Sequence, residues 1–340
     1  MASSSYQPPS LLFPLQPMHP DLVVPFGELV RNGPARRLWL GQSVVAETHQ
    51  TFAYLAGRGI KVPVGTSVTL MPMRHPLEAA AQARSLAIIT GQPVVSGHGA
   101  ATPELVAALR GAPYDKPATA AAGYASAVRG ILDGGIEGHE CEACVGTAGL
   151  HPVKHPPVEV GLGVIRPGMA RAAGAVADVA ITWMTPPAYV RDTLIPALAE
   201  GAADRPAPPR VVTVVHVALA NPGRDPRKLA HAGAGVHLGT PHYTDMLRRA
   251  GVAADPADPK AGAAALVETG VYVYGTAAEV AERLRDYRDA GVDEVVLNPA
   301  GVVLTEGWKA GLADLTEILS ACEDLEAGES DDEPHGGVHE

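Results

Sequence analysis

The chain has 340 residues, of which 46% are hydrophobic, and this content excludes a chain that is disordered throughout. The formal charge is −11, but residues 323–340 include eight acids and no Lys or Arg, and without these eight charges the rest of the chain carries −3. A body this close to neutral gives no indication of a nucleic-acid partner or an anionic membrane partner.

We expect residues 1–322 to form a single domain and residues 323–340 to form a disordered acidic tail, because the tail has few apolar side chains to bury. Removal of the residues after Leu325 should then leave the melting temperature unchanged. No stretch approaches 18 uninterrupted apolar residues, and the start MASSSYQPPS has no basic stretch followed by an apolar one. The sequence therefore predicts a cytoplasmic protein.

Short apolar runs alternate with Ala- and Leu-rich stretches along almost the whole sequence. Near-continuous apolar strands that alternate with helices are typical of a parallel sheet covered by helices. Eight such units predict an α/β fold, namely a closed (β/α)8 barrel of the TIM type. Among the helical stretches, residues 276–290 have Thr276 as N-cap and Glu279 three residues on. The predicted strands are residues 11–16, 37–42, 62–70, 93–97, 158–163, 178–183, 210–219 and 292–298.

Two connections are longer than a barrel needs: residues 98–157 after the fourth predicted strand and residues 220–291 after the seventh. Insertions at these places emerge at the C-terminal ends of the strands, where barrels build substrate sites. The first insertion contains the pair Cys141 and Cys144 beside His139, which resembles half of a zinc site. Structural zinc sites normally show a second pair of ligands. We predict an irregular loop with reduced thiols and no metal, in a reducing compartment.

Polar side chains end several predicted strands, and in a barrel such side chains converge at one end. They are Gln16, Gln42, Ser43, Thr66, Ser67 and His98. The sequence has no P-loop, no G-x-S-x-G and no G-x-G-x-x-G that opens a helix. The absence of these motifs disfavours nucleotide hydrolysis, serine hydrolysis and NAD binding of the Rossmann type.

His98 is the main candidate for proton transfer at the strand ends. It lies between Gly97 and Gly99, which would allow a cofactor to approach the backbone closely. An unperturbed histidine pKa near 6.5 suits proton donation at neutral pH. The alternative is a histidine that only positions a ring or satisfies a backbone carbonyl. Tyr124, in the first insertion, is a further candidate.

The chain is similar to a known family in four segments: RLWLGQ (37–42), VPVGTSVTLMPMRHP (62–76), VSGHGAATPE (95–104) and VYGTAAEVAERLRDYRDAGVDEVVLNP (273–299). On these segments it resembles the luciferase-like family, and the resemblance spans roughly residues 10–320. This family comprises barrel oxidoreductases that use a flavin or the deazaflavin coenzyme F-420. The resemblance therefore implies coenzyme F-420, with FMN as the alternative cofactor.

The resemblance also implies which residues hold the cofactor. Members that use F-420 often carry a cis peptide bond between two non-proline residues on the third strand, and the matching pair here is Ser67 and Val68. The turn after the fifth strand implies backbone donors for the cofactor's phosphate at Gly163 and Val164, with Arg166 as an added charge. The implied cofactor-binding residues are Gln16, Gln42, Thr66, Ser67, Val68, Gly97, His98, Gly99, Gly163, Val164 and Arg166.

Four residues depart from the family pattern. Relatives frequently have Asp-His or Glu-His where this chain has Gln42 and Ser43, and that histidine takes the substrate's hydroxyl proton in several deazaflavin dehydrogenases. Gln42 can form a hydrogen bond but cannot act as a base, so alcohol oxidation by the same route is disfavoured. Ala100 stands where sugar-phosphate dehydrogenases carry Glu, and Arg166 stands where Gly is common.

Together these features favour an F-420-dependent reductase that delivers a hydride to an electron-poor C=C or C=N bond, with His98, Gln42 and Tyr124 as catalytic residues. Some luciferase-like reductases act on dehydroalanine in modified peptides, and we extend this to a small-molecule or modified-peptide substrate here. An FMN-dependent monooxygenase is the alternative, and a non-catalytic binding protein on a decayed barrel is the second alternative. Relatives are often dimers, so we expect a homodimer.

Overall fold

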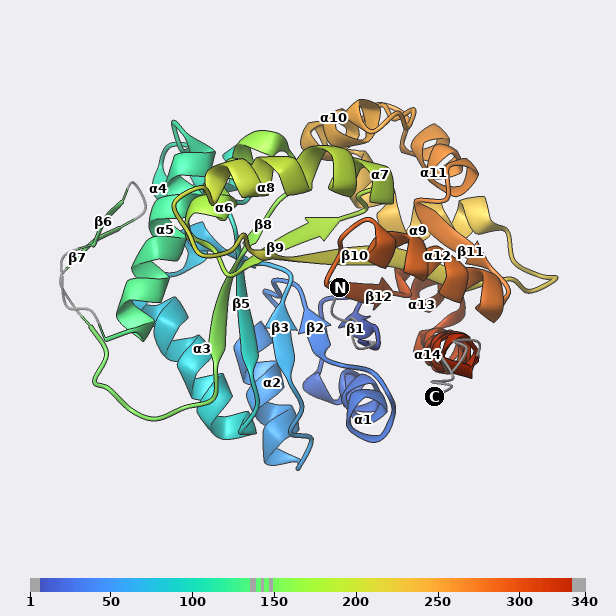
Figure 1. Cartoon of the computed structure of the whole chain (residues 1–340), viewed down its shortest axis with the longest axis horizontal. Coiled ribbons are helices and arrows are strands. Elements are labelled where there is room, and N and C mark those ends of the chain that lie inside the picture. Colours follow the sequence, from blue (N-terminus) through green and yellow to red (C-terminus); the bar gives the residue numbers. More distant parts are fainter. Residues whose placement is uncertain (1–6, 135–138, 142–143, 147–148, 332–340) are drawn as a thin grey trace, which may run out of the picture.

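A computed structural model describes residues 7–134, 139–141, 144–146 and 149–331. In this part of the chain, eight parallel strands close into a ring that helices surround (Figure 1). The sequence-based prediction of a (β/α)8 barrel is confirmed. In order around the ring, the strands are β1 (Ser10–Phe13), β2 (Leu38–Leu40), β3 (Val64–Thr66), β5 (Val94–Gly99), β8 (Val158–Gly163), β9 (Val179–Trp183), β10 (Arg210–Leu219) and β12 (Glu294–Asn298), which pairs with β1.

The helices form the outer layer, and most of them begin with proline, whose missing N–H removes no hydrogen bond in the first turn. The predicted cap of α12 is present, because Thr276 and Glu279 bond each other's backbone N–H. None of the helices in the described ranges has the length and apolar content to cross a bilayer. They are α1 (Val24–Asn32), α2 (Thr48–Gly57), α3 (Pro76–Thr90), α4 (Pro103–Arg110), α5 (Pro117–Leu132), α6 (Pro167–Val176), α7 (Pro187–Tyr189), α8 (Ile195–Gly201), α9 (Pro226–Leu238), α10 (Pro241–Arg249), α11 (Pro259–Glu268), α12 (Ala277–Asp289), α13 (Ala300–Glu306) and α14 (Trp308–Asp331).

Both predicted insertions contain strands that the sequence analysis missed. In the first, β6 (His139–Cys141) and β7 (Cys144–Gly146) form an antiparallel pair, so the cysteine-containing segment is not wholly irregular. In the second, β11 (Tyr272–Gly275) pairs with the C-terminal half of β10. Each of these strands has only three or four residues, too few for a period-two pattern to stand out.

The third predicted strand, residues 62–70, is two short strands in the structure. β3 ends at Thr66, and β4 (Thr69–Leu70) pairs with β5 where Thr69 lies opposite His98. The peptide bond between them, Ser67–Val68, is cis, as the resemblance implied. The residues between β3 and β4 therefore lie at the C-terminal end of the barrel.

The inside of the barrel is filled by apolar side chains from alternate positions of the strands, as expected for a ring of this size. Trp39 takes most of the space on the β2 side, because a Cβ added to Gly65 would lie 2.6 Å from its indole. Val68 and Trp183 are half-buried and pack on this interior cluster. The cluster is Leu12, Trp39, Val95, Val179, Ile181, Val212, Val214 and Val296.

Glu294, the first residue of β12, places a buried carboxylate at the N-terminal end of the barrel. Its Oε1 accepts hydrogen bonds from Ser10 Oγ at 2.7 Å and from Trp39 Nε1 at 2.8 Å. Arg37 Nε lies 3.3 Å from the same oxygen, and Arg210 lies 3.5 Å from Oε2. Although burial alone would raise the pKa of Glu294, the charge of Arg37 and its neighbours lowers it below its usual value.

The predicted end of the domain at residue 322 falls inside a helix, because α14 continues to Asp331. Leu325 packs against the core, and Glu326 forms an ion pair with Arg288 of α12. These contacts hold the start of the acidic segment on the body, which composition alone did not indicate. The remainder of the predicted tail, residues 332–340, lies outside the described residues.

Truncation after Leu325 is now expected to lower the melting temperature by about 1 to 3 °C, because a partly buried ion pair contributes about 0.5 to 1 kcal/mol. Differential scanning calorimetry of the truncated chain and of Glu326→Gln measures this. The two variants should behave alike if the pair with Arg288 is the main contact. An unchanged melting temperature in both would restore the expectation of a dispensable segment.

Candidate functional site

The C-terminal ends of the ring strands surround a floor made by Val68 and Trp183, which cover the interior cluster from this side. Val68 lies over two glycines of neighbouring strands. A Cβ added to Gly99 would lie 2.5 Å from Val68 Cγ2, and one added to Gly163 would lie 3.5 Å from Cγ1. We refer to Val68, Trp183, Gly41, Gly99 and Gly163 as the barrel floor.

Gly41 leaves open space on this floor. Its Cα–H side faces inward, as the side chain of Trp39 does two residues earlier. Among the described residues, a Cβ added there would come within 4 Å of a single atom, the carbonyl oxygen of Ser67, at 3.5 Å. An apolar floor with open space over glycine backbone fits the flat, fused heterocycle that the sequence resemblance implies.

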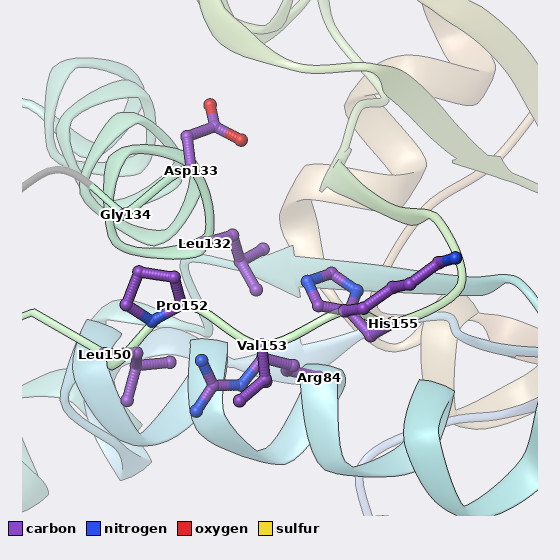
Figure 2. A pocket seen from close by; sticks show the side chains of 9 residues that line it. Arg84, Leu132, Asp133, Gly134, Leu150, Pro152, Val153 and His155 are labelled. Carbon is purple, nitrogen blue, oxygen red and sulfur yellow. The ribbon is translucent and has the colours of Figure 1, made fainter.

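A hollow on the outer surface lies elsewhere (Figure 2). Its lining includes Arg84 of α3, Asp133 after the end of α5, and Leu150 and His155 before β8. Helices end, and strands begin, at the N-terminal face of a barrel, so this hollow belongs to the opposite end from the barrel floor. It contains none of the predicted site residues.

Gln42 holds the segment that carries Val68. Its backbone N–H donates to Val68 O at 3.0 Å, and its side-chain Oε1 accepts from Leu70 N at 3.1 Å. Ser67, the residue before Val68, donates its backbone N–H to the carbonyl oxygen of Leu40 on β2 at 2.9 Å. The side-chain oxygen of Gln42, a predicted cofactor-binding residue, is therefore already used within the protein, and Gln42 supports the barrel floor from its outer side.

Two other predicted cofactor residues also use their side chains within the protein. Gln16 is exposed, and its Oε1 accepts from Val44 N at 3.0 Å, which joins the loops after β1 and β2. Thr66 Oγ1 donates to Gly97 O at 2.9 Å and accepts from Gly97 N at 2.8 Å. These contacts link neighbouring elements of the ring.

His98, which the sequence analysis predicts to face the cofactor, does not lie on the barrel floor. Side chains alternate along a strand, and Val95 points inward, so His98 points outward to the helices. Its nitrogens lie 3.3 Å from Thr69 Oγ1 and 3.1 Å from Ser96 Oγ, and its ring contacts Tyr124 of α5 at 5.2 Å between centroids. Burial, with the nearby charge of Arg74, lowers the pKa of His98 to about 3, so the ring is neutral at pH 7 and lacks the second ring proton that an imidazolium would donate as an acid.

Tyr124 accompanies His98 in the same layer. Its hydroxyl donates to Arg74 O at 3.2 Å, and burial raises the pKa of the phenol further above its usual range. The two predicted proton donors, His98 and Tyr124, therefore lie together between β5 and α5 and not on the barrel floor.

We expect His98→Gln to change turnover by less than about tenfold, whereas loss of a general acid costs about 10²- to 10⁴-fold. Glutamine retains a donor and an acceptor for Thr69 and Ser96. Steady-state kinetics on the purified variant give the result. A fall of more than 10²-fold, with unchanged cofactor affinity, would return His98 to the catalytic residues.

The predicted phosphate donors are only partly available. Gly163 lies at the floor, but Val164 is fully buried and its N–H donates to Ile181 O at 2.7 Å. Arg166 is about half exposed at the start of α6 and lies 3.7 Å from Asp245 of α10. Of the three residues, Arg166 alone has a charged group that a ligand can reach.

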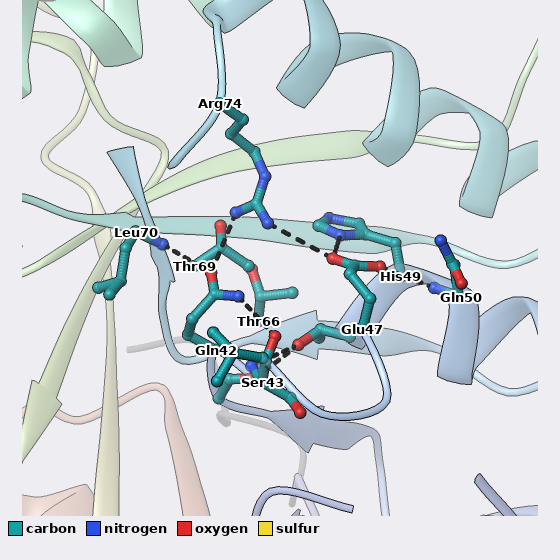
Figure 3. Close-up of polar contacts among 12 residues, drawn as sticks. Gln42, Ser43, Glu47, His49, Gln50, Thr66, Thr69, Leu70 and Arg74 are labelled. Carbon is teal, nitrogen blue, oxygen red and sulfur yellow. Dashed lines mark hydrogen bonds and ion pairs between the residues drawn. The ribbon is translucent and has the colours of Figure 1, made fainter. Parts of the chain in front are cut away.

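Sequence reasoning missed a charged group beside Gln42 (Figure 3). Arg74 lies 3.3 Å from Gln42 Oε1 and 3.4 Å from Glu47 Oε1, and His49 Nδ1 donates to the same Glu47 oxygen at 2.9 Å. Burial raises the pKa of Glu47, but the hydrogen bond from His49 and the charge of Arg74 outweigh it and bring the pKa to about 2. The signal was present in the segment MPMRHP, where a single Arg follows a buried strand.

On the other side of the floor, Trp183 and His237 of α9 have their rings 5.1 Å apart. Trp183 Nε1 and His237 Nδ1 are buried, and neither has a hydrogen-bond partner in the described ranges. Burial lowers the pKa of His237 to about 4, so its imidazole is neutral at pH 7. Unpaired buried polar atoms are rare and often mark a place where a ligand supplies the partner.

Comparison with known proteins agrees with this architecture. The family described as luciferase-like monooxygenase matches residues 35–294. No curated protein matches the chain significantly. The coenzyme F420-dependent tetrahydromethanopterin reductase of Methanopyrus kandleri is 18% identical with a TM-score of 0.70, and the match covers 94% of this chain and 99% of that one.

Two further solved structures share the fold. An F420-dependent secondary alcohol dehydrogenase, solved with an F420-acetone adduct, is 17% identical with a TM-score of 0.72 and covers 93% of this chain and 99% of its own. The oxygenating constituent of 3,6-diketocamphane monooxygenase from Pseudomonas putida, solved with FMN, is 14% identical with a TM-score of 0.65 and covers 93% and 98%. Because the family match extends over most of the barrel, the chain belongs to the luciferase-like monooxygenase family, a family of flavin- or deazaflavin-dependent oxidoreductases.

Proposed function

We propose that the protein is an F-420-dependent reductase that delivers a hydride to an activated C=C or C=N bond. The observation that carries this proposal is the lack of titratable side chains on the barrel floor, which consists of Val68, Trp183 and three glycines. Oxidation of an alcohol requires a base for the hydroxyl proton, and none of these five residues is a base. The imidazole of His237, beside Trp183, is a weak base because burial lowers its pKa to about 4. Reduction of a polarised double bond by a hydride requires no base.

Two comparisons support the deazaflavin over FMN. The two F420-dependent enzymes have TM-scores of 0.70 and 0.72, above the value of 0.65 for the FMN complex. When bound, a reduced deazaflavin supplies two electrons as a hydride. The protein's own part is to seat the ring on Val68 over the space at Gly41, with Gln42 fixing that seat from behind.

The proton that completes the reduction comes from solvent in this proposal. His98 and Tyr124 are buried behind β5, and Glu47 is engaged with Arg74 and His49. The reductase therefore needs a substrate whose anionic intermediate is stable enough to await a proton from water.

For the substrate we propose an uncharged, amide-bearing molecule such as dehydroalanine in a modified peptide. The support is the pair Trp183 Nε1 and His237 Nδ1, on rings whose centroids lie 5.1 Å apart: an unpartnered donor and an unpartnered imidazole nitrogen match the C=O and N–H of an amide. We further propose a cytoplasmic homodimer without nucleic-acid or membrane partners, which sizing with light scattering and cell fractionation would test.

Titration of the purified protein with F-420 and with FMN tests the cofactor. We expect saturable quenching of F-420 fluorescence at micromolar concentration and binding of FMN at least tenfold weaker. Tighter binding of FMN, with O2-dependent consumption of substrate, would favour the monooxygenase. Binding of neither cofactor would favour the non-catalytic alternative and reject the proposed function.

A further inference from the structure

The loop after β2 and the loop after β4 are joined by a line of polar contacts that ends on the floor segment, defined here as Thr66 to Leu70 (Figure 3). Glu47 lies at the far end and contacts Arg74 at 3.4 Å. Arg74 contacts Gln42 Oε1 at 3.3 Å, and the same oxygen accepts from Leu70 N at 3.1 Å. The line therefore runs Glu47, Arg74, Gln42, Leu70.

We propose that Glu47 is a positioning residue that, through Arg74 and Gln42, fixes the floor segment and so determines how tightly the deazaflavin ring is held. The link to the ring rests on the proposed function. The link to the floor segment rests on the contacts alone and is tested separately below.

The carboxylate of Glu47 is itself held in one orientation. Oε1 accepts from His49 Nδ1 at 2.9 Å and Oε2 accepts from Gln50 N at 3.0 Å. Both oxygens are therefore fixed by the first turn of α2, and Oε1 is presented to Arg74. A carboxylate restrained at both oxygens is a rigid counter-charge, unlike the flexible side chains of most surface ion pairs.

Arg74 needs this counter-charge because it is almost removed from water. Its side chain is 7% exposed, and its other hydrogen-bond partner among the described side chains is the neutral amide of Gln42. A buried guanidinium without a carboxylate is strongly unfavourable, so loss of the Glu47 charge should drive Arg74 toward solvent. Gln42 Oε1 would then keep a single donor, Leu70 N, and the restraint on the floor segment would weaken.

The chain offers a matched control at a different place. Arg224 is also 7% exposed and pairs with Glu306, which is 34% exposed, compared with 28% for Glu47. This pair joins the end of β10 to α13, across the ring from β3. Glu306→Gln removes a carboxylate of similar exposure from a buried Arg, but Arg224 keeps a second ion pair with Asp314, and Glu306 has no contact with the floor segment. It therefore controls for loss of a charge, not for an Arg left without a carboxylate.

The first measurement is hydrogen–deuterium exchange of the protein without cofactor. In Glu47→Gln we expect peptides covering residues 66–74 to exchange about tenfold faster, with Glu47→Asp intermediate. Glu306→Gln should leave these peptides unchanged. Equal exchange of residues 66–74 in Glu47→Gln and the parent protein would overturn the positioning role, whether or not any cofactor binds.

The second measurement is the dissociation constant for F-420, which we expect to rise about tenfold in Glu47→Gln and not in Glu306→Gln. In the double variant Glu47→Gln with Gln42→Leu, the effect should equal that of Gln42→Leu alone, because both changes break one line. Additive effects would overturn transmission through Gln42. If the parent protein binds no F-420, the proposed function fails, and the exchange result still decides the role of Glu47.

Discussion

Replacement of Glu294 by Gln should lower the free energy of unfolding by about 3 to 5 kcal/mol, the cost of removing one partner of a buried ion pair. The side chain of Glu294 is 0% exposed, and that of Arg37, its closest charged neighbour, is 5% exposed. Glutamine keeps an oxygen for Ser10 and Trp39 but leaves Arg37 with a buried charge and no carboxylate. Urea unfolding followed by circular dichroism measures the loss.

The same residue gives a dependence on pH whose sign follows from its pKa. The folded pKa of Glu294 lies below its usual value. A carboxylate with a lowered folded pKa contributes stability above the unfolded value of about 4.3, and this contribution is lost as pH falls through the folded value. The parent protein should lose this stability below about pH 4, and Glu294→Gln should show a smaller loss over the same range.

An exposed ion pair provides the control. Glu200 bonds Arg171 at 2.6 Å, but both side chains are half or more exposed. Glu200→Gln should leave the unfolding curve unchanged, because solvent screens exposed pairs. Equal effects of Glu200→Gln and Glu294→Gln would show that the buried charge has no special weight.

The fold was predictable because it depends on patterns that one sequence displays. Runs such as residues 158–163 and 210–219 are apolar enough to mark strands of a covered parallel sheet, and the structure places β8 and β10 there. The short pairing of β11 with β10 was not predictable, since it depends on β10 extending past the ring. The continuation of α14 past residue 322 comes with tertiary contacts that composition does not show, namely the packing of Leu325 and the ion pair between Arg288 and Glu326.

The positions of the glycines in the candidate site could be predicted from the sequence better than the directions of its polar side chains. Val68, Gly99 and Gly163 do meet at the barrel floor, because their place on neighbouring strands decides where they lie. His98 was misplaced because a strand end alone does not say which way a side chain points, whereas alternation from inward-facing Val95 does. Glu47 and Arg74 are 27 residues apart in sequence, and only the folded chain brings them together.

Gly41→Leu should abolish or greatly weaken cofactor binding while the protein still folds. The inward side of Gly41 is open, since an added Cβ meets one atom, Ser67 O, at an ordinary contact distance of 3.5 Å. The leucine side chain would extend from β2 across the floor toward Val68, where we propose that the ring lies. Forced overlap with a packed group costs about 1 to 3 kcal/mol, which corresponds to binding about 5- to 150-fold weaker.

Gly57→Leu is the matched substitution for this test. Gly57 is the last residue of α2, is exposed, and has no described atom within 4 Å of an added Cβ. Fluorescence titration with F-420 and a melting curve, each on both variants, separate the two properties: Gly41→Leu should lose affinity at a nearly unchanged melting temperature, and Gly57→Leu should lose neither. If Gly41→Leu binds F-420 as tightly as the parent protein does, the ring does not lie over β2. The proposed binding of the ring on Val68 is then wrong.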